Sequence, residues 1–234
     1  MALRTGRTLG GDLRRALGNP LLAWGYIRRW SRLGKFAGVP ATEIRRYRDE
    51  LVADRPFQSH LEGNLPRARG GFGRSAELYV LARALKPEVV VETGVASGVS
   101  SAHWLRALAA NGKGRLYSID LPNLNDGVAL PAGKNPGWIV PDDLRARWEL
   151  RLGDSRALIP ELLASLGAVD FFFHDSDHSK ESMLFEFEAA FPKVRAGGLI
   201  LSDDTNYNDA WDEFCARHGL PGNRVVHMGV ARKP

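Results

Sequence analysis

From about residue 66 onward, short apolar runs alternate with helical patterns, and this alternation constrains the fold more than any other feature of the chain. The apolar runs predict strands at 89–91, 116–120, 148–152, 169–174 and 199–201. The remaining segments predict helices at 74–85, at 100–111, through Leu162 and Leu163, at 180–194 and at 209–218. Strands separated by helices require crossover connections and form a mostly parallel sheet. We therefore expect an α/β fold, Rossmann-like and doubly wound, over residues 66–234, with a helical extension before it at 1–65.

Positive charge is concentrated in the first fifty residues. Eleven basic groups stand there against four acidic ones, which gives +7; because the whole chain carries +5, the rest carries −2. One helical face of this segment holds Leu22, Tyr26, Trp30 and Leu33, and another holds Arg28, Arg32 and Lys35. This pattern predicts a helix packed on the main domain with a solvated basic side. The alternative is docking to an anionic lipid surface or an acidic partner.

Several classes of protein are excluded or disfavoured by composition. Cys215 is the only cysteine, so neither an internal disulfide nor a cysteine metal site can form, and the chain suits a reducing compartment. No apolar run reaches the roughly 18 residues that a membrane span needs, and we expect a cytoplasmic protein. Nucleic-acid binding is not expected, because no recognised binding module accompanies the basic segment.

The first strand of the alternating region ends in a glycine turn with an acidic residue before it. The sequence Glu92-Thr93-Gly94 is followed by Gly98 and by Ser100 and Ser101, where a helix is expected. A dinucleotide fingerprint, G-x-G-x-x-G, fails here because Ala and Val occupy the second and third glycine positions. A carboxylate beside the turn suits a cationic ligand such as S-adenosylmethionine (SAM), which carries a sulfonium and an ammonium group. The two serines and the helix N-terminus could then bind the carboxylate of that ligand.

Acidic residues also follow the second and third strands. Asp120 lies about twenty residues beyond the glycine turn, where a carboxylate can accept hydrogen bonds from ribose hydroxyls. The alternative for Asp120 is to cap a loop. Asp154, with Ser155 after it, could cap the next helix, contact an adenine amino group, or do both. The segment 122–141, which is rich in Gly, Pro and Asn and contains Trp138, predicts a long functional loop such as a lid.

Taken together, these motifs resemble those of the class I SAM-dependent methyltransferases over roughly residues 74–218. The resemblance rests on Glu92, Gly94, Gly98, Ser100 and Asp120, on Gly153-Asp154-Ser155, and on Ala196-Gly197-Gly198 before the fifth strand. It is nearest to the small-molecule O-methyltransferases of the catechol, caffeoyl-CoA and antibiotic-sugar types. That branch implies SAM as cofactor, and a divalent metal held by residues after strands four and five. By resemblance the metal ligands would be Asp175, Asp203 and Asp204, although asparagine is common at the last position.

Physical reasoning gives the metal some independent support. Asp175, Asp177, Asp203 and Asp204 follow two strands that should be neighbours, so their charges would repel one another unless a cation neutralises them. Oxygen ligands of this kind suit Mg²⁺ or another hard divalent cation. Alternatively, some of these residues cap helices or face water.

The expected reaction is transfer of a methyl group from SAM to a hydroxyl of a small-molecule acceptor. Asp175 would act through the metal, and His178 would take the hydroxyl proton or, alternatively, hydrogen-bond to a carboxylate at a helix start. His174 is expected to be structural. Other functions left open are a metal-independent methyltransferase, a nucleotide-dependent oxidoreductase, and a SAM-binding protein that docks through its basic helix.

The end of the chain is short for this family, which usually finishes with two antiparallel strands. Residues 225–228 and 230–233 could form a clipped strand pair with Gly229 at the bend. The partner in a homodimer could also complete that edge of the sheet.

Overall fold

A computed structural model describes residues 20–70, 75–122 and 130–234, with side chains from Arg28 onward. Its centre is a seven-stranded sheet in the order β3-β2-β1-β4-β5-β7-β6. The strands are β1 (Val89–Thr93), β2 (Arg115–Asp120), β3 (Trp148–Leu152), β4 (Val169–His174), β5 (Val194–Ser202), β6 (Arg224–Val225) and β7 (Met228–Arg232). Strands β1 to β5 are parallel, whereas β7 is antiparallel to both β5 and β6. The predicted doubly wound, mostly parallel sheet is confirmed.

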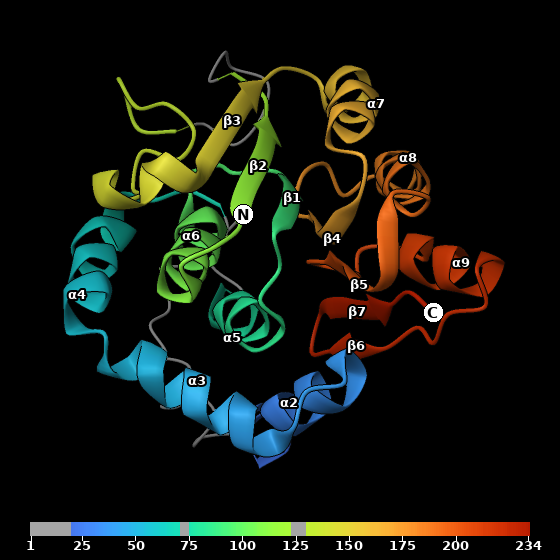
Figure 1. The fold of residues 1–234 in the computed structure, drawn as a ribbon, viewed down its shortest axis with the longest axis horizontal. Coiled ribbons are helices and arrows are strands. Elements are labelled where there is room, and N and C mark those ends of the chain that lie inside the picture. Colours follow the sequence, from blue (N-terminus) through green and yellow to red (C-terminus); the bar gives the residue numbers. More distant parts are fainter. Residues whose placement is uncertain (1–19, 71–74, 123–129) are drawn as a thin grey trace.

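Helices cover both faces of the sheet (Figure 1). One face carries α5 (Ser75–Leu85), α6 (Val99–Asn111) and the 3₁₀ helix η2 (Asp142–Arg147). The opposite face carries α7 (Ser155–Leu166), α8 (Lys180–Ala190) and α9 (Ala210–Arg217). Before them come α2 (Pro20–Ala37), α3 (Ala41–Ala53), α4 (Arg55–Asn64) and the 3₁₀ helix η1 (Leu65–Arg67). No described helix is both long and apolar enough to cross a bilayer.

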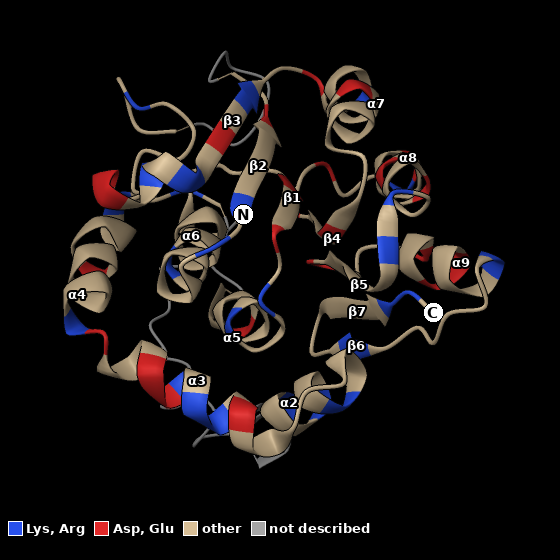
Figure 2. Ribbon diagram, viewed as in Figure 1, with Lys and Arg blue, Asp and Glu red and all other residues tan. Residues whose placement is uncertain are grey.

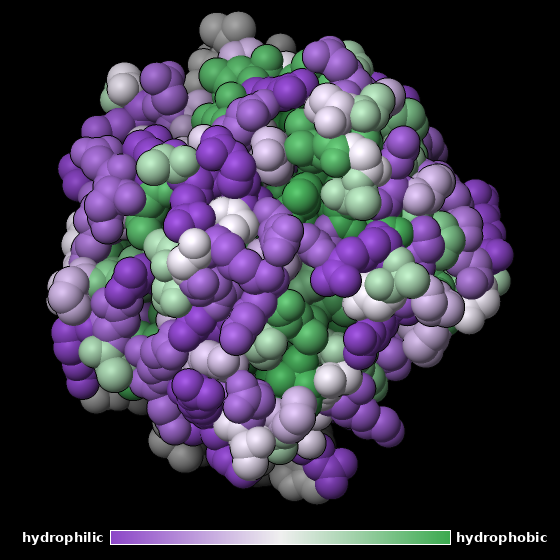
Figure 3. Space-filling model, viewed as in Figure 1, coloured by the Kyte–Doolittle hydropathy of each residue, from purple (hydrophilic) through white to green (hydrophobic). Residues whose placement is uncertain are grey.

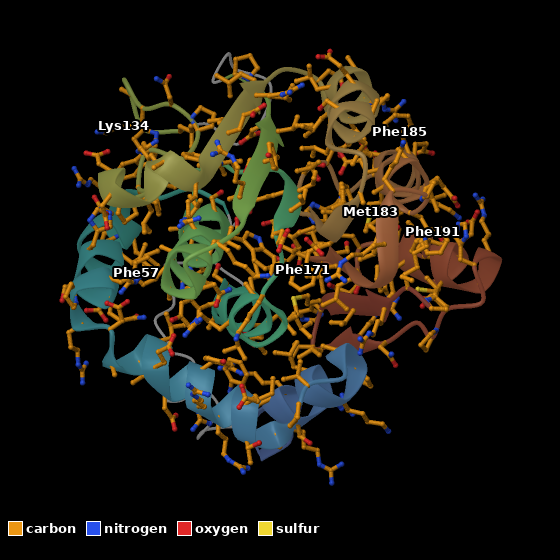
Figure 4. The ribbon with its side chains drawn as sticks, in the orientation of Figure 1. Phe57, Lys134, Phe171, Met183, Phe185 and Phe191 are labelled. Carbon is orange, nitrogen blue, oxygen red and sulfur yellow. The ribbon has the colours of Figure 1, made fainter. Side chains whose placement is uncertain are left out.

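Alternating side chains of the strands divide the interior into two cores. Phe171 and Phe173 of β4 join the core shared with α2 to α6, whereas Phe172 between them joins the core shared with α7 to α9. Phe171 therefore lies on the α5 side and Met183 on the α8 side (Figure 4). Buried strands of this kind read as continuous apolar runs, which is why the sequence located them. Polar residues cover most of the outer face in Figure 3, and apolar groups show mainly near its centre.

The N-terminal helices wrap the α5–α6 face and share its core. Helix α2 packs against β6, β7 and α5, with Leu33 fully buried. Arg29 is also buried and lies 3.3 Å from the carboxylate of Glu77 in α5. Helix α3 is tied to α5 by Glu50, which accepts hydrogen bonds from the Tyr79 hydroxyl at 2.5 Å and the Arg83 guanidinium at 2.6 Å. The division at residue 65 falls within η1 and stays a prediction, because the extension and the sheet share one core.

Basic residues of α2 and α3 lie on the outside of this extension (Figure 2). Arg28, Arg32 and Lys35 are all exposed, so the predicted basic side of α2 faces solvent. The side chains of Leu22 and Tyr26 lie outside the part of the chain whose side chains are described, but the apolar face is confirmed for Leu33 and the half-buried Trp30.

Two glycine assignments were wrong. Gly197 and Gly198 do not precede the fifth strand but lie inside β5, where the register with β4 shifts. Gly229 is not the final bend: the chain turns at Val226, whose φ is +60°, and Gly229 lies in β7 against the ring of Trp211. A Cβ at Gly229 would lie 2.5 Å from that ring, so close packing requires the glycine. The clipped strand pair itself is confirmed, with only two residues in β6.

Candidate active site

The glycine turn joins β1 to α6 at the carboxyl edge of the sheet. Gly94 has φ +80° and Gly98 has φ +95°, in the left-handed region that favours glycine, and Ala96 between them has φ +46°. A Cβ at Gly94 would lie 2.7 Å from the nitrogen of Ser176 and still closer to the Asp175 carbonyl. The Asp175 amide also donates to the carbonyl of Thr93, at 2.9 Å. The turn is thus pressed against the end of β4, and Gly94 permits that approach.

Glu92 is buried behind this turn. One of its oxygens, Oε2, accepts hydrogen bonds from Ser101 Oγ at 2.5 Å and Ser118 Oγ at 2.9 Å. The other, Oε1, is buried with no hydrogen-bond donor among the described residues. Burial raises the pKa of Glu92 to about 7, although the hydroxyls of Ser100, Ser101 and Ser118 oppose that shift. A carboxylate with one unsatisfied oxygen is able to receive a cationic donor.

We expect ligand binding at this carboxylate to depend on pH. The pKa of Glu92 is raised from 4.5 to about 7, so the unliganded protein keeps this carboxyl group protonated up to about pH 7, and the cost to folding stability accumulates between about pH 4.5 and 7. A cationic ligand favours the ionised form. Affinity for SAM should therefore rise about tenfold between pH 6 and pH 8, measured by calorimetry. Glu92→Gln should abolish this dependence, whereas Glu88→Gln, at the exposed opposite end of β1, should keep it. A parallel pH profile in Glu92→Gln would contradict the assignment.

Asp120 caps the glycine turn. Its Oδ2 accepts from the amides of Val95 at 3.0 Å and Ala96 at 2.7 Å, and its Oδ1 accepts from the amide of Leu121 at 2.8 Å. Burial raises the pKa of Asp120, and these amides oppose the shift. The structure therefore shows the loop-capping role that the sequence left as the alternative. Each oxygen keeps a second lone pair, so a contact with ribose stays a prediction.

Two serine and threonine predictions need correction. The hydroxyl of Thr93 donates to Glu186 Oε2 at 2.5 Å, so its side chain is turned to the α8 face and not to a ligand. The hydroxyl of Ser101 is bound to Glu92, and Ser100 is buried behind the same carboxyl group. Ser101 is therefore not placed as the expected partner of a ligand carboxylate, whereas Ser100 Oγ has no hydrogen-bond partner among the described residues, and its contact with a ligand stays a prediction.

A buried network that the sequence did not reveal lies under the end of β4. Glu186 of α8 is fully buried; its Oε2 lies 2.6 Å from Nδ1 of His174, and its Oε1 accepts from Ser176 Oγ at 2.8 Å. Despite its burial, the pKa of Glu186 is lowered by His174 and by hydroxyl donors. His174 is thus structural, as predicted. The only available signal was the position of Glu186 on the helical face that also holds Met183, Phe187 and Ala190.

The third strand presents Asp154 as the N-cap of α7. Its Oδ1 accepts from the amide of Arg156 at 2.8 Å, which confirms the capping role and leaves the adenine contact as a prediction for Asp154 and Ser155. Two large apolar residues lie exposed between the two acidic residues: Leu121 is 44% exposed and Leu152 is 47% exposed. Asp120 and Leu152 are paired in the sheet, so these leucines give an apolar surface beside Asp120. Sequence reasoning missed them.

A group of carboxylates surrounds Asp175 at the carboxyl edge. The pKa of Asp175 is raised well above its ordinary value, first by burial and then by the charges of Asp203, Glu92, Asp204 and Asp120. The acidic residues after β1, β2, β4 and β5 are therefore close enough to interact. Asp177 is not part of the group: it is exposed and accepts from the amide and hydroxyl of Ser179 at 3.1 and 2.8 Å. The sequence predicted that four carboxylates converge after strands four and five, and this prediction was wrong for Asp177.

The donor chemistry of Asp175, Asp203 and Asp204 fits a hard divalent cation, because their mutual repulsion is what a cation would relieve. Their arrangement is less complete. In the described ranges no three His, Cys, Asp or Glu side chains are grouped so that they could hold a metal ion. Asp204 has φ +47°, so its backbone is already in an unusual conformation. Metal binding here stays a prediction.

His178 lies between the carboxylate group and α8. Its ring is 5.2 Å from the ring of His174 and 5.4 Å from that of Tyr207, centroid to centroid. Burial and the nearby His174 lower the pKa of His178, so the imidazole is neutral at pH 7 and able to accept a proton. The alternative role, a hydrogen bond to a carboxylate at the helix start, is filled instead by Ser179 with Asp177.

The segment 130–141 is docked onto the glycine turn. The amide of Gly137 donates to Ala96 O at 2.8 Å, and the amide of Ile139 donates to Ser97 O at 3.2 Å. A Cβ at Gly98 would lie 2.7 Å from Gly137 Cα, so this contact closes over the start of α6. Residues 123–129 of the predicted lid lie outside the described residues. The described part, residues 130–141, covers the glycine turn and is hydrogen-bonded to it.

Fold and site together define an α/β domain with a group of acidic side chains at the edge where parallel sheets bind ligands. Residues 91–205 match a protein family described as a methyltransferase domain. The SAH-bound methyltransferase PaMTH1 of Podospora anserina (SAH is S-adenosylhomocysteine) aligns at 16% identity and a TM-score of 0.55 over 76% of this chain and 87% of that one. An O-methyltransferase from Bacillus cereus in complex with SAH aligns at 18% identity and a TM-score of 0.53 over 77% and 90%. Curated protein sequences give no match.

The solved structures show that the fold is shared. The family match indicates methyltransferase chemistry for the domain. Residues 91–205 thus carry the signature of a methyltransferase domain, on a fold that the solved methyltransferases share. The resemblance drawn from the glycine turn and the acidic strand ends is confirmed, and the oxidoreductase alternative is set aside.

Proposed function

We propose that the protein transfers a methyl group from SAM to a hydroxyl of a small-molecule acceptor, with assistance from a divalent metal such as Mg²⁺. One observation carries this proposal: the parallel pairing of β2, β1, β4 and β5 brings Asp120, Glu92, Asp175, Asp203 and Asp204 to a single edge of the sheet, where the other four charges raise the pKa of Asp175. A region of that charge suits a sulfonium and ammonium ligand and, beside it, a hard cation. The similarity to proteins described as O-methyltransferases supports hydroxyl as the acceptor group.

The residues of the chain have separate parts in this reaction. Glu92 receives the ammonium group through its unpaired oxygen, and the turn from Gly94 to Gly98 lets the cofactor approach the backbone. Asp120 accepts from the ribose, and the exposed Leu121 and Leu152 give the adenine an apolar surface. Because the sulfonium is already activated, alignment of the acceptor with the methyl group supplies most of the acceleration.

The acceptor hydroxyl has to lose its proton during the transfer. Asp175, Asp203 and Asp204 would hold the metal, which when bound lowers the pKa of an oxygen ligand and stabilises its negative charge. His178, neutral and close to Asp204, takes the proton. Parts of the N-terminal extension and the 130–141 segment cover the acceptor and select it.

Calorimetric titration with SAH, with and without Mg²⁺, tests this proposal. We expect SAH to bind without metal, since its partners lie on β1 to β3, and Mg²⁺ to bind separately with release of protons from Asp175. NAD serves as the control ligand and should give no heat. Absence of SAH binding would reject the function as a whole, whereas absence of Mg²⁺ binding would reject only its metal-assisted form.

A metal-independent methyltransferase is the second candidate. It is favoured by the finding that the described side chains offer no three-ligand group for a metal. In that case His178 and Asp175 alone handle the proton. A non-catalytic SAM-binding protein that docks through the exposed Arg28, Arg32 and Lys35 is the third candidate. Co-sedimentation of the full chain with anionic and neutral vesicles tests it, and absence of binding to either rejects it.

A further inference from the structure

One buried carboxylate beneath the candidate site has no part in the reaction proposed above. Glu186 lies in α8 and is fully buried, on the same helix face as Met183, which is labelled in Figure 4. Removing a carboxylate from water is costly unless several donors bind it. Glu186 therefore needs an explanation, either in the stability of the fold or in the function of the site.

The donors to Glu186 come from the ends of two neighbouring strands. Its Oε2 accepts from the Thr93 hydroxyl of β1 at 2.5 Å and lies 2.6 Å from Nδ1 of His174 in β4. Its Oε1 accepts from the Ser176 hydroxyl at 2.8 Å. Burial acts to raise the pKa of Glu186, but His174 and hydroxyl donors outweigh it and lower the pKa. The group is thus a carboxylate, which only accepts hydrogen bonds, so His174 presents Nδ1–H to it.

Two of these partners flank Asp175 in the sequence. Side chains alternate in direction along a strand, and the alternation continues past the end of β4. His174 and Ser176 both contact Glu186 on the α8 side. Asp175 between them is instead buried close to the acidic side chains of the carboxyl edge. One carboxylate thus holds the backbone on both sides of Asp175.

Asp175 is also joined to the neighbouring strand. Its amide donates to the carbonyl of Thr93 at 2.9 Å, and the hydroxyl of the same threonine is bound to Glu186. Thr93 directly precedes Gly94, the first glycine of the turn. The end of β1, the backbone at Asp175 and the carboxylate of α8 therefore form one closed hydrogen-bonded unit. This unit fixes the spacing between the glycine turn and Asp175.

We propose that Glu186 is a positioning residue that holds Asp175 at a fixed place relative to the glycine turn. Because Glu186 is fully buried, it acts through Thr93, His174 and Ser176 and not by contact with a ligand. We call these four residues the Glu186 clamp. Its effect on methyl transfer rests on the proposed function, whereas its effect on the backbone at Asp175 does not. A displacement of about 1 Å at a reacting group can lower a rate about a hundredfold, so the clamp affects catalysis as well as folding.

Steady-state kinetics of Glu186→Gln test the positioning role. The amide keeps the size of the side chain, but its NH₂ group cannot accept a hydrogen bond, so a donor of the clamp loses its partner. We expect kcat to fall about tenfold to a hundredfold. The KM for SAM and the calorimetric affinity for SAH should stay within about threefold, because sheet pairing on both sides of β1 still holds the turn. Equal losses of kcat and SAH affinity would assign Glu186 to the fold alone.

Glu188→Gln is the matched control for this variant. Glu188 lies two residues further along α8, but its carboxylate faces α9, where Oε2 lies 2.8 Å from Nε2 of His218. Its replacement removes a carboxylate from the same helix and should change neither kcat nor SAH affinity. A loss of kcat in Glu188→Gln as large as that in Glu186→Gln would contradict a specific role for the clamp.

A double-mutant cycle separates positioning from a general loosening of the fold. If Glu186 acts through Asp175, then Glu186→Gln should lower kcat by less than about threefold in the Asp175→Asn background. The same tenfold to hundredfold loss in both backgrounds, on the scale that a misplaced reacting group gives, would overturn the proposal.

Ser176 gives a second variant pair if Glu186→Gln does not fold. Ser176 is only half-buried, so its replacement disturbs little packing. Ser176→Ala removes the donor to Oε1 and should lower kcat about tenfold, whereas Ser176→Thr keeps the hydroxyl and should restore most of the rate. An unchanged kcat in Ser176→Ala would overturn the proposal.

Amide hydrogen exchange, followed by NMR, gives a measurement that does not depend on methyl transfer. The Asp175 amide is protected by its bond to the Thr93 carbonyl. Loosening the clamp in Glu186→Gln should speed exchange at Asp175 about tenfold and leave the amides in the middle of β4 unchanged. Unchanged exchange at Asp175 would overturn the clamp even if kcat fell. Should the parent transfer no methyl group, the proposed function falls, and this measurement still tests the clamp.

Discussion

Asp175→Asn should lower the rate of methyl transfer by about a hundredfold to a thousandfold while leaving SAH affinity nearly unchanged. The variant keeps the shape of the side chain but loses the negative charge that would attract a cation or accept a proton. Because burial and the neighbouring carboxylates raise the pKa of Asp175, its ionised form costs stability in the unliganded protein as the pH rises. The asparagine variant should therefore melt at the same temperature as the parent or higher. Steady-state kinetics and calorimetric melting measure the two effects.

Asp177→Asn is the matched control for this variant. Asp177 lies two residues further on, is exposed and is bonded to Ser179, so its loss should leave methyl transfer within about threefold of the parent. EDTA should reproduce the Asp175→Asn defect if the metal assists. Loss of activity in Asp175→Asn without any effect of EDTA would favour the metal-independent enzyme. Full activity in both experiments would remove Asp175 from the reaction.

Gly94→Ala should destabilise the protein by about 2–5 kcal/mol and abolish SAH binding. Two costs combine at this position. The φ of +80° is strained for any residue with a Cβ, and the added carbon would overlap the Asp175 carbonyl and lie 2.7 Å from the nitrogen of Ser176. Since both partners are backbone atoms, no side-chain rotation can relieve the overlap. Urea unfolding measures the free-energy change.

Gly112→Ala separates these two costs. Gly112 ends α6 with a similar φ of +71°, but no atom lies within 4 Å of the position its Cβ would occupy. Its replacement should cost only the backbone strain, about 1–2 kcal/mol, and leave SAH binding intact. Equal losses of stability in the two variants would show that the close approach of the turn to β4 has no energetic importance.

The sequence predicted the sheet well because its strands are buried on both faces. Runs such as Phe171, Phe172 and Phe173 are apolar whichever core each ring enters, so their position was legible without knowledge of the fold. Helix ends were less accurate: α8 stops at Ala190, whereas its pattern extended to Val194, because residues 191–193 form a turn before β5 begins.

The sequence predicted where the residues of the candidate site lie in the fold, but not the directions in which their side chains point. Glu92, Asp120 and Asp175 do gather at one edge, as strand ends in a parallel sheet must. The direction of each side chain depends on contacts across long sequence distances, which no local pattern records. Thr93 turns toward Glu186, which lies 93 residues further along the chain, and Ser97 meets Arg69 and Trp138 from opposite directions in the sequence.

Backbone hydrogen bonds join Ala96 and Ser97 to Arg69 and to residues 137–139. These bonds have a consequence for exchanging segments between related enzymes. The N-terminal extension, the connection between β2 and β3, and the glycine turn meet in one hydrogen-bonded junction. His60 of α4 contacts the same junction through the carbonyl of Ile139, at 2.7 Å. A chimera that receives only the N-terminal extension of a related enzyme would lack the right hydrogen-bond partners for Ser97. These three segments should be exchanged together. Such an exchange would change the affinity for the cofactor along with the preference for the acceptor.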